Sequence, residues 1–166
     1  RHQHKENIDL VVWPETAVLF DIMEEGNTSL LLKSSFKNIE NIIVGGIRKD
    51  KTNEKRKIYN SLFLIDNISN TIGYHDKIKL VPFGEYIPFR SVLKNFKILL
   101  GGLDFSSGEK LSFLELNNNV KVLPLICYEV IFPKTTRLEK NNHDLIVNIT
   151  NDAWFGSSRG PYQHLA

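Results

Sequence analysis

The sequence is poor in the features that would tie it to a compartment or a partner. A single cysteine, Cys127, excludes an internal disulfide. That thiol could be an inert packed side chain, part of an intermolecular bridge or a reactive nucleophile. No run approaches the roughly 18 apolar residues that cross a bilayer, and the charged opening from Arg1 lacks the apolar stretch of a signal peptide. The chain as given is therefore not expected to insert itself into a membrane.

The sequence also lacks a large excess of either positive or negative charge. The formal net charge is +2 at pH 7, without the concentrated basic field that nucleic-acid binding needs, so no nucleic-acid partner is expected. The densest basic stretch, Lys49–Lys57, also carries acidic residues and is interpreted as a hairpin tip. With 166 residues, the chain has the size of one folded domain. Because it opens on Arg1 and not on methionine, we expect it to be part of a longer protein.

Short apolar runs rich in β-branched residues predict a series of strands. They are Ile8–Trp13, Asn41–Ile47, Ile58–Ile65, Leu111–Leu116, Val120–Cys127 and Leu145–Thr150. Apolar residues at helical spacing predict helices at Thr28–Ile39 and Phe89–Leu100, and Pro133 favours the first turn of another. Strands separated by hairpins and helices indicate a layered α/β or α+β domain.

The segment Leu123–Pro133 predicts a buried strand that ends at Cys127 and is followed by a turn and a helix. At a helix N-terminus, free N–H groups and the helix dipole lower the pKa of a thiol and can hold an oxyanion. Such a position suits a nucleophile. The alternative is a small apolar residue packed in a core strand, and this segment alone favours that alternative.

Two further segments could supply partners for a nucleophile. In the structured loop Tyr74–Pro88, Lys77 and Lys79 would share a face of an extended chain, and either ammonium could stabilise a thiolate or an oxyanion. Glu15 follows an apolar strand, where its carboxylate could act as a general base. The alternatives are a pair of solvated lysines and, for Glu15, a helix-capping acid ahead of residues 17–20.

A fourth segment, Leu145–Ser158, predicts a buried strand that runs into a polar and aromatic turn. This turn could form one wall of a pocket. An Asx-type turn explains Asn151 and Asp152 equally well. The segment by itself does not decide between the two interpretations.

Together and in this order, the four segments resemble the nitrilase (carbon-nitrogen hydrolase) superfamily, whose members use Glu, Lys and Cys in that chain order on an αββα sandwich. Four motifs resemble the apolipoprotein N-acyltransferase family more closely. They are Trp-Pro-Glu-Thr at 13–16, Leu-Val-Pro-Phe-Gly-Glu-Tyr-Ile-Pro at 80–88, Cys-Tyr-Glu at 127–129 and Asn-Asp-Ala-Trp-Phe-Gly-Ser at 151–157. The resemblance implies a partial catalytic domain over residues 1–166, incomplete at both ends and without the family's transmembrane helices.

The resemblance implies a catalytic triad of Glu15 as general base, Lys77 as oxyanion-stabilising cation and Cys127 as nucleophile. It selects Lys77 over Lys79 because the family's lysine stands eight residues before the glutamate that is Glu85 here. No metal or cofactor is implied. Supporting acids are implied at Glu85 and Glu129, and pocket residues at Tyr128 and Trp154.

The implied reaction has two steps. Cys127 attacks a phospholipid ester to form a thioester, and the acyl group then passes to the N-terminal amine of a diacylglyceryl-cysteine on an apolipoprotein. The resemblance also implies the bacterial inner membrane, with the catalytic domain facing the periplasm. The amphipathic stretch 87–100 fits either an interfacial helix or a core-packed helix. A soluble amidase of the superfamily and a non-catalytic fragment remain as alternatives.

Overall fold

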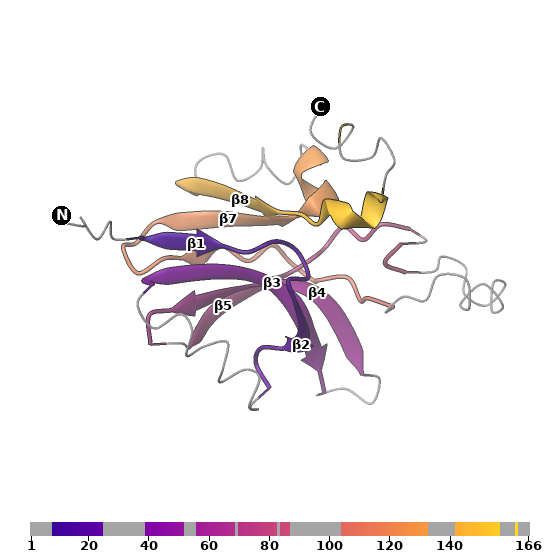
Figure 1. Cartoon of the computed structure of the whole chain (residues 1–166), viewed down its shortest axis with the longest axis horizontal. Helices are drawn as coiled ribbons and strands as arrows, with labels where there is room; N and C mark the ends of the chain where they lie inside the picture. Colours follow the sequence, from indigo (N-terminus) through magenta and orange to yellow (C-terminus); the bar gives the residue numbers. More distant parts are fainter. Residues whose placement is uncertain are drawn as a thin grey trace, which may run out of the picture.

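The computed structural model of the chain describes residues 8–24, 39–51, 56–68, 70–82, 84–86, 104–132, 142–156 and 162. Two β-sheets lie one above the other and form the centre of the molecule (Figure 1). The predicted helices Thr28–Ile39 and Phe89–Leu100, except for Ile39, lie outside the described residues, as does the helix expected from Pro133. Among the described residues, no helix combines the length and apolar character needed to span a bilayer.

The larger sheet has five strands, and the longest two form its middle. Their bounds are β1 Leu10–Val12, β2 Val18–Asp21, β3 Asn41–Asp50, β4 Lys57–Asp66 and β5 Thr71–Asp76. β3 and β4 are antiparallel and paired as far as Asp50 and Lys57, which confirms the predicted hairpin. β5 is antiparallel to β4, and β1 and β2 both run parallel to β3. The bend between β1 and β2, which carries Glu15, therefore lies beside the middle of β3.

The smaller sheet brings two chain segments to one edge. It consists of β6 Leu114–Glu115, β7 Lys121–Ile126 and β8 Leu145–Ile149. β7 and β8 are parallel, with Ile126 opposite Ile149. Since parallel strands end at the same edge of a sheet, Cys127 and Thr150 follow their strands side by side. A short 3-10 helix continues from each strand, η2 Cys127–Ile131 and η3 Asp152–Phe155.

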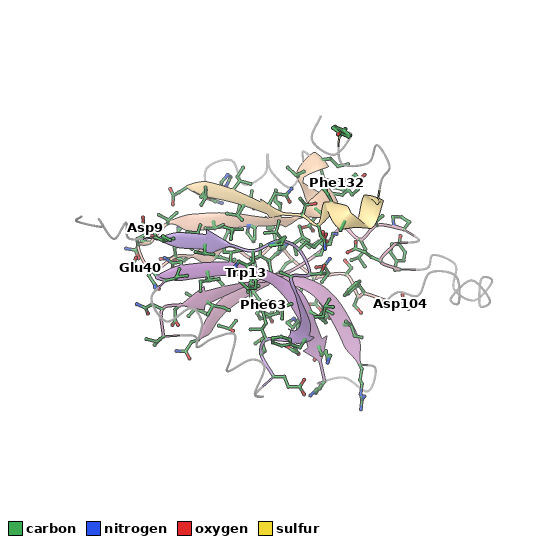
Figure 2. All side chains as sticks on the ribbon, in the orientation of Figure 1. Asp9, Trp13, Glu40, Phe63, Asp104 and Phe132 are labelled. Atoms are coloured by element: carbon green, nitrogen blue, oxygen red, sulfur yellow. The ribbon has the colours of Figure 1, made fainter. Side chains whose placement is uncertain are left out.

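Both faces of the larger sheet are covered by apolar side chains. One face packs against the smaller sheet, and side chains of both layers fill the space between them (Figure 2). This cluster consists of Ile43, Leu62, Leu64, Leu114, Leu116, Val122, Ile126, Cys127, Val147 and Ile149. The opposite face carries a second cluster of Val18, Ile22, Ile42, Val44, Phe63 and Ile65. Neighbouring residues of β3 and β4 thus point to opposite faces and are buried on both, which explains their continuous apolar runs.

All six predicted strands are present; the first and fourth are at most half as long as predicted, and the fifth and sixth are shorter by one or two residues. Two strands escape prediction from the sequence. β2 occupies the place where a helix would have made Glu15 a capping acid, so that alternative is wrong. β5 escapes because Gly73 and His75 weaken its strand pattern, and its second half overlaps the segment Tyr74–Pro88 that was interpreted as a loop. The predicted buried strand β8 is partly open, with Leu145 38% and Ile146 45% exposed.

Candidate active site

Glu15 is placed by the bend between β1 and β2. The N–H of Trp13 donates to the carbonyl of Ile43 at 2.7 Å, and Pro14, which has no N–H, ends this pairing. Thr16 follows with a φ of 49°, a left-handed conformation that is costly for a β-branched residue. The bend turns the Glu15 side chain inward, where it is 3% exposed. The backbone is thus strained at the point where it buries a carboxylate.

Gly45 of β3 is the residue that lets this bend approach the sheet. A Cβ at Gly45 would collide with the carbonyl oxygen of Pro14 and lie 2.7 Å from Glu15 Cα and 2.8 Å from Thr16 N. Gly45→Ala is therefore expected to push the bend away and lower the free energy of unfolding by about 1–3 kcal/mol. Under the base role that the family resemblance implies for Glu15, the displaced carboxylate should slow acylation of Cys127 by a p-nitrophenyl ester up to roughly 100-fold. Thermal melts and nitrophenolate release measure the two effects.

Gly46→Ala is the matched control for this prediction. A Cβ at Gly46 would lie 3.3 Å from Phe63 Cε2 and 3.3 Å from the carbonyl oxygen of Val18, contacts that shifts of a few tenths of an ångström relieve. Its acylation rate is expected to stay within about twofold of the parent. Equal losses of rate at both glycines would contradict a specific role for Gly45 in placing Glu15.

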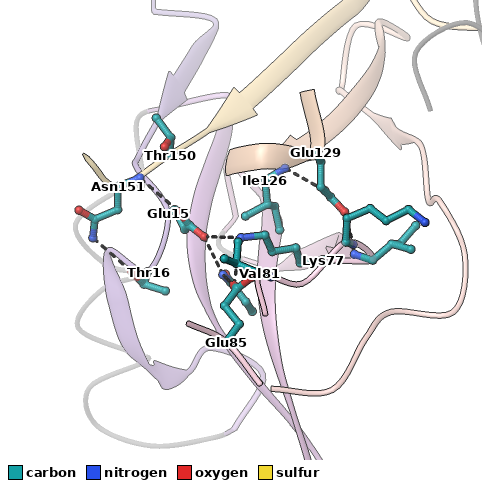
Figure 3. Close-up of polar contacts among 12 residues, drawn as sticks. Glu15, Thr16, Lys77, Val81, Glu85, Ile126, Glu129, Thr150 and Asn151 are labelled. Atoms are coloured by element: carbon teal, nitrogen blue, oxygen red, sulfur yellow. Dashed lines mark hydrogen bonds and ion pairs between the residues drawn. The ribbon is translucent and has the colours of Figure 1, made fainter. Parts of the chain in front are cut away.

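Lys77 lies between two carboxylates (Figure 3). Its Nζ is 3.1 Å from Glu15 Oε1 and 3.0 Å from Glu85 Oε1. Asn60 Nδ2 donates to the same two oxygens, at 2.7 and 2.9 Å. Burial by itself lowers the pKa of Lys77, but the charges of Glu15 and Glu85 outweigh it and raise that pKa. The lysine is therefore a cation at neutral pH.

The chain turns immediately after Lys77. Glu129 Oε1 accepts hydrogen bonds from the N–H groups of Ile78 at 2.7 Å and Lys79 at 3.1 Å. Lys77 is buried, at 1% exposure, while Lys79 is exposed, with its Nζ 5.9 Å from the centre of the Phe132 ring. The two lysines do not share an environment, so the expectation for an extended chain is wrong.

Glu129 joins the turn that follows Lys77 (the lysine turn) to the turn at Cys127 (the cysteine turn). Its Oε2 accepts from the N–H of Ile126 at 2.9 Å and faces His75 Nε2 at 3.3 Å. Burial by itself raises the pKa of Glu129, but the hydrogen bond and charge of His75 and the backbone N–H groups of Ile78 and Lys79 outweigh it and lower that pKa. Glu129 is therefore ionised at neutral pH and fixes the backbone on both sides of the site.

Cys127 begins η2 with a φ of 55° and is 7% exposed. Burial, and after it the charge of Glu15, raises the pKa of its thiol. Lys77, the Thr150 side chain and the Tyr128 backbone act in the opposite direction without overcoming this. The expected lowering of the thiol pKa is thus wrong, because burial and the charge of Glu15 outweigh the favourable contacts, and η2 is a single 3-10 segment of 5 residues with little dipole. A protonated thiol needs a base before it can attack.

Asn151 connects the last motif to Glu15. Its N–H donates to Glu15 Oε2 at 3.2 Å, and its side chain donates to Thr16 Oγ1 at 3.4 Å. Its own Oδ1 accepts from the N–H of Ala153 at 3.2 Å. The Asx-type turn is therefore confirmed for Asn151, which also contacts Glu15, while the pocket wall stays a prediction. The side chain of Trp154 lies outside the described residues, and Tyr128 packs half-buried against the core, so their pocket roles remain predictions.

Over residues 2–166 the chain matches the sequence model of the carbon-nitrogen hydrolases. The chain belongs to the carbon-nitrogen hydrolase family. Curated relatives named apolipoprotein N-acyltransferase include one from Rhizobium rhizogenes, 39% identical over 163 residues. Another from Geobacter metallireducens is 39% identical over 161 residues. These matches cover 94% and 95% of this chain but only 30% and 31% of the relatives.

Solved carbon-nitrogen hydrolase structures share the fold. One is XC1258 from Xanthomonas campestris, with a TM-score of 0.56 and 18% identity over 93% of this chain and 55% of that chain. Another is Nit3 from Saccharomyces cerevisiae, with a TM-score of 0.57 and 20% identity over 86% of this chain and 51% of that chain. The predicted nitrilase-like α/β sandwich is thereby confirmed. Within the described part of the chain, no His, Cys, Asp and Glu side chains group as a metal site would need.

In this carbon-nitrogen hydrolase chain, the structure brings Glu15, Lys77 and Glu85 into direct contact. It also places Cys127 where the charges of Glu15 and Lys77 both act on its thiol. Asn60, which contacts Glu15 and Glu85, is not predicted from the sequence as a site residue. The available signal was a lone amide inside the apolar run of β4, because a buried amide must find hydrogen-bond partners.

Proposed function

We propose that this chain carries the catalytic groups of an apolipoprotein N-acyltransferase, with Glu15, Lys77 and Cys127 as its triad. The observation that carries the proposal is the set of relatives of that name, which are 35–39% identical over 94–96% of the chain. Its relation to solved amidases is a likeness of fold at 15–17% identity. The buried cluster of two carboxylates and an ammonium beside a thiol supports thioester chemistry.

In the first step, Glu15 takes the proton of the Cys127 thiol while the sulfur attacks the carbonyl carbon of a phospholipid ester. A base is required because the thiol pKa is raised by burial and by the charge of Glu15. The ammonium of Lys77 stabilises the oxyanion of the tetrahedral intermediate. Its collapse breaks the ester C–O bond, the leaving alkoxide takes the proton from Glu15, and a lysophospholipid departs. The acyl group remains on Cys127 as a thioester.

In the second step, the N-terminal amine of a diacylglyceryl-cysteine attacks the thioester carbon. Glu15 accepts a proton from the amine, and Lys77 again stabilises the oxyanion. The C–S bond breaks, the thiolate of Cys127 takes the proton from Glu15, and an N-acylated apolipoprotein is released. The enzyme returns to its starting state without a cofactor.

Other residues support these steps. Glu85 contacts the ammonium of Lys77 beside Glu15, and Glu129 fixes the backbone between Lys77 and Cys127. Tyr128 and Trp154 are proposed to line the pocket for the acyl chain. The donor and acceptor are both lipid-linked, so the proposal places the reaction at the periplasmic face of the bacterial inner membrane.

The test is incubation of the chain with phospholipid vesicles, followed by mass measurement of the intact protein. The expected product is Cys127 bearing one fatty acyl chain, labile to hydroxylamine, discharged by a diacylglyceryl-cysteine peptide and absent as a thioester from Cys127→Ser. An unmodified Cys127 thiol in a folded chain would contradict the proposal. Ammonia release from small amides without any lipid requirement would identify an amidase instead.

A further inference from the structure

Asn60 is a buried amide at the centre of the site, and the steps above give it no role. It lies in β4 and is 2% exposed. Its Nδ2 bridges Glu15 Oε1 and Glu85 Oε1, at 2.7 and 2.9 Å. Its backbone carbonyl accepts the N–H of Lys77 at 2.9 Å. One residue therefore contacts both carboxylates and the backbone of the lysine between them.

The orientation of the Asn60 amide follows from these partners. An amide nitrogen carries two hydrogens, and each is directed at one carboxylate. The flipped amide would set its oxygen against two anionic oxygens. In the observed orientation Oδ1 is buried and finds no hydrogen-bond partner among the described residues, which is costly. Within the described part of the chain, the amide thus leaves its own acceptor unpaired while it keeps both donors on Glu15 and Glu85.

Lys77 and Asn60 both bridge Glu15 and Glu85, and the number of hydrogens on the Lys77 ammonium shows why the second bridge matters. An ammonium has three hydrogens, and Lys77 directs two of them to Glu15 and Glu85. Both carboxylates depend on this single ammonium. With Asn60 as a neutral second bridge, the pair stays together without taking the third hydrogen of Lys77. That hydrogen remains for the thiol side of the site, where the charge of Lys77 acts on Cys127.

We propose that Asn60 is a positioning residue of the acyl-transfer reaction. It holds the Glu15 and Glu85 carboxylates at fixed separation, so that Glu15 can exchange a proton while Lys77 keeps one N–H directed at the forming oxyanion. The inference rests on the roles proposed above for Glu15, Lys77 and Cys127.

Two substitutions separate this role from simple packing. Asn60→Leu keeps the approximate volume and removes both donors. Asn60→Asp is closer in shape but sets a third carboxylate against the first two. The acylation rate per folded molecule should fall about 10- to 30-fold in the leucine variant and about tenfold further in the aspartate variant. A packing role predicts the opposite order, with the closer isostere at least as active.

The assay is acylation of Cys127 by p-nitrophenyl butyrate, followed by nitrophenolate release and intact mass. The loss should appear in the maximal acylation rate and leave the half-saturating ester concentration unchanged, because Asn60 acts through Glu15 and Glu85. From about pH 8 to about pH 6 the aspartate variant should gain on the leucine variant, because a carboxyl beside two others protonates readily and can then donate. Unchanged rates in both variants, or aspartate matching leucine at every pH, would overturn the inference.

Asn148 in β8 offers a matched control. Its amide oxygen is also buried without a partner in the described part of the chain, and Asn148→Leu is expected to stay within about twofold of the parent rate. The small ester reports on thioester formation alone. A parent chain acylated by the ester but not by phospholipid overturns the proposed substrate and leaves the comparison at Asn60 valid. A folded parent that the ester does not acylate overturns the triad and this inference together.

Discussion

Lys77→Met is expected to slow acylation of Cys127 roughly 1,000-fold, because it removes the ammonium that is proposed to stabilise the oxyanion. Methionine has a similar length and no charge, so the loss is electrostatic and not a matter of volume. The substitution also leaves Glu15 and Glu85 buried without their cation. Removing one partner of a buried ion pair costs about 3–5 kcal/mol, so the variant should melt at a clearly lower temperature than the parent.

The pH dependence of Lys77→Met has a defined sign. The folded pKa of Lys77 is raised, so its contribution to stability is complete below the unfolded pKa of about 10.4. That contribution is lost as the pH rises through the folded pKa, and the parent and variant should converge only in strong alkali. The positive charge of Lys77 lowers the pKa of Cys127. Without it, the pH profile of iodoacetamide alkylation of this single cysteine should move to higher pH.

Lys79→Met is the control for both effects. Lys79 is exposed and contacts the Phe132 ring, so its loss should change stability by less than about 1 kcal/mol and leave the acylation rate near that of the parent. Equal defects in the two variants would show that the family spacing to Glu85 selects the wrong lysine.

The positions of Glu15 and Cys127 along the chain could be predicted because each follows a recognisable apolar strand. Their environments could not. The thiol pKa depends first on burial and then on the charge of Glu15, which lies 112 positions earlier in the sequence and reaches Cys127 only through the packing of two sheets. The local sequence pattern indicates only the favourable start of a helix at Cys127, and it therefore predicts the wrong direction for the shift of the thiol pKa.

The strands β2 and β5 could not be predicted from the sequence for a related reason. β2 is held by parallel pairing to β3 across a strained bend that depends on Gly45, and nothing local in its four residues signals that partner. The amide of Asn60 likewise gains its meaning from Glu15 and Glu85, which lie 45 and 25 positions away. Sequence patterns locate the chemical groups, whereas the hydrogen bonds that set their protonation and spacing come from tertiary contacts.

Glu129→Gln is expected to show how strongly one carboxylate holds the two halves of the site. Every backbone partner of Glu129 is a donor, namely the N–H groups of Ile78, Lys79 and Ile126. The amide NH2 of glutamine must therefore face at least one N–H in either orientation, and a buried unpaired donor is costly. The expected loss is about 2–4 kcal/mol in the free energy of unfolding.

Acylation of Cys127 should fall roughly 1,000-fold in Glu129→Gln, because the lysine turn and the cysteine turn lose their common anchor and the reacting groups lose their geometry. The folded pKa of Glu129 is lowered, so its stabilisation is complete above the unfolded pKa of about 4.3 and is lost as the pH falls through the folded pKa. Denaturant melts should thus separate parent and variant at neutral pH and converge in acid.

The control is Glu109→Gln at an exposed carboxylate, whose free energy of unfolding is expected to stay within about 0.5 kcal/mol of the parent. A Glu129→Gln chain with the parent's melt and the parent's acylation rate would show that the Lys77 and Cys127 turns hold their places without this carboxylate.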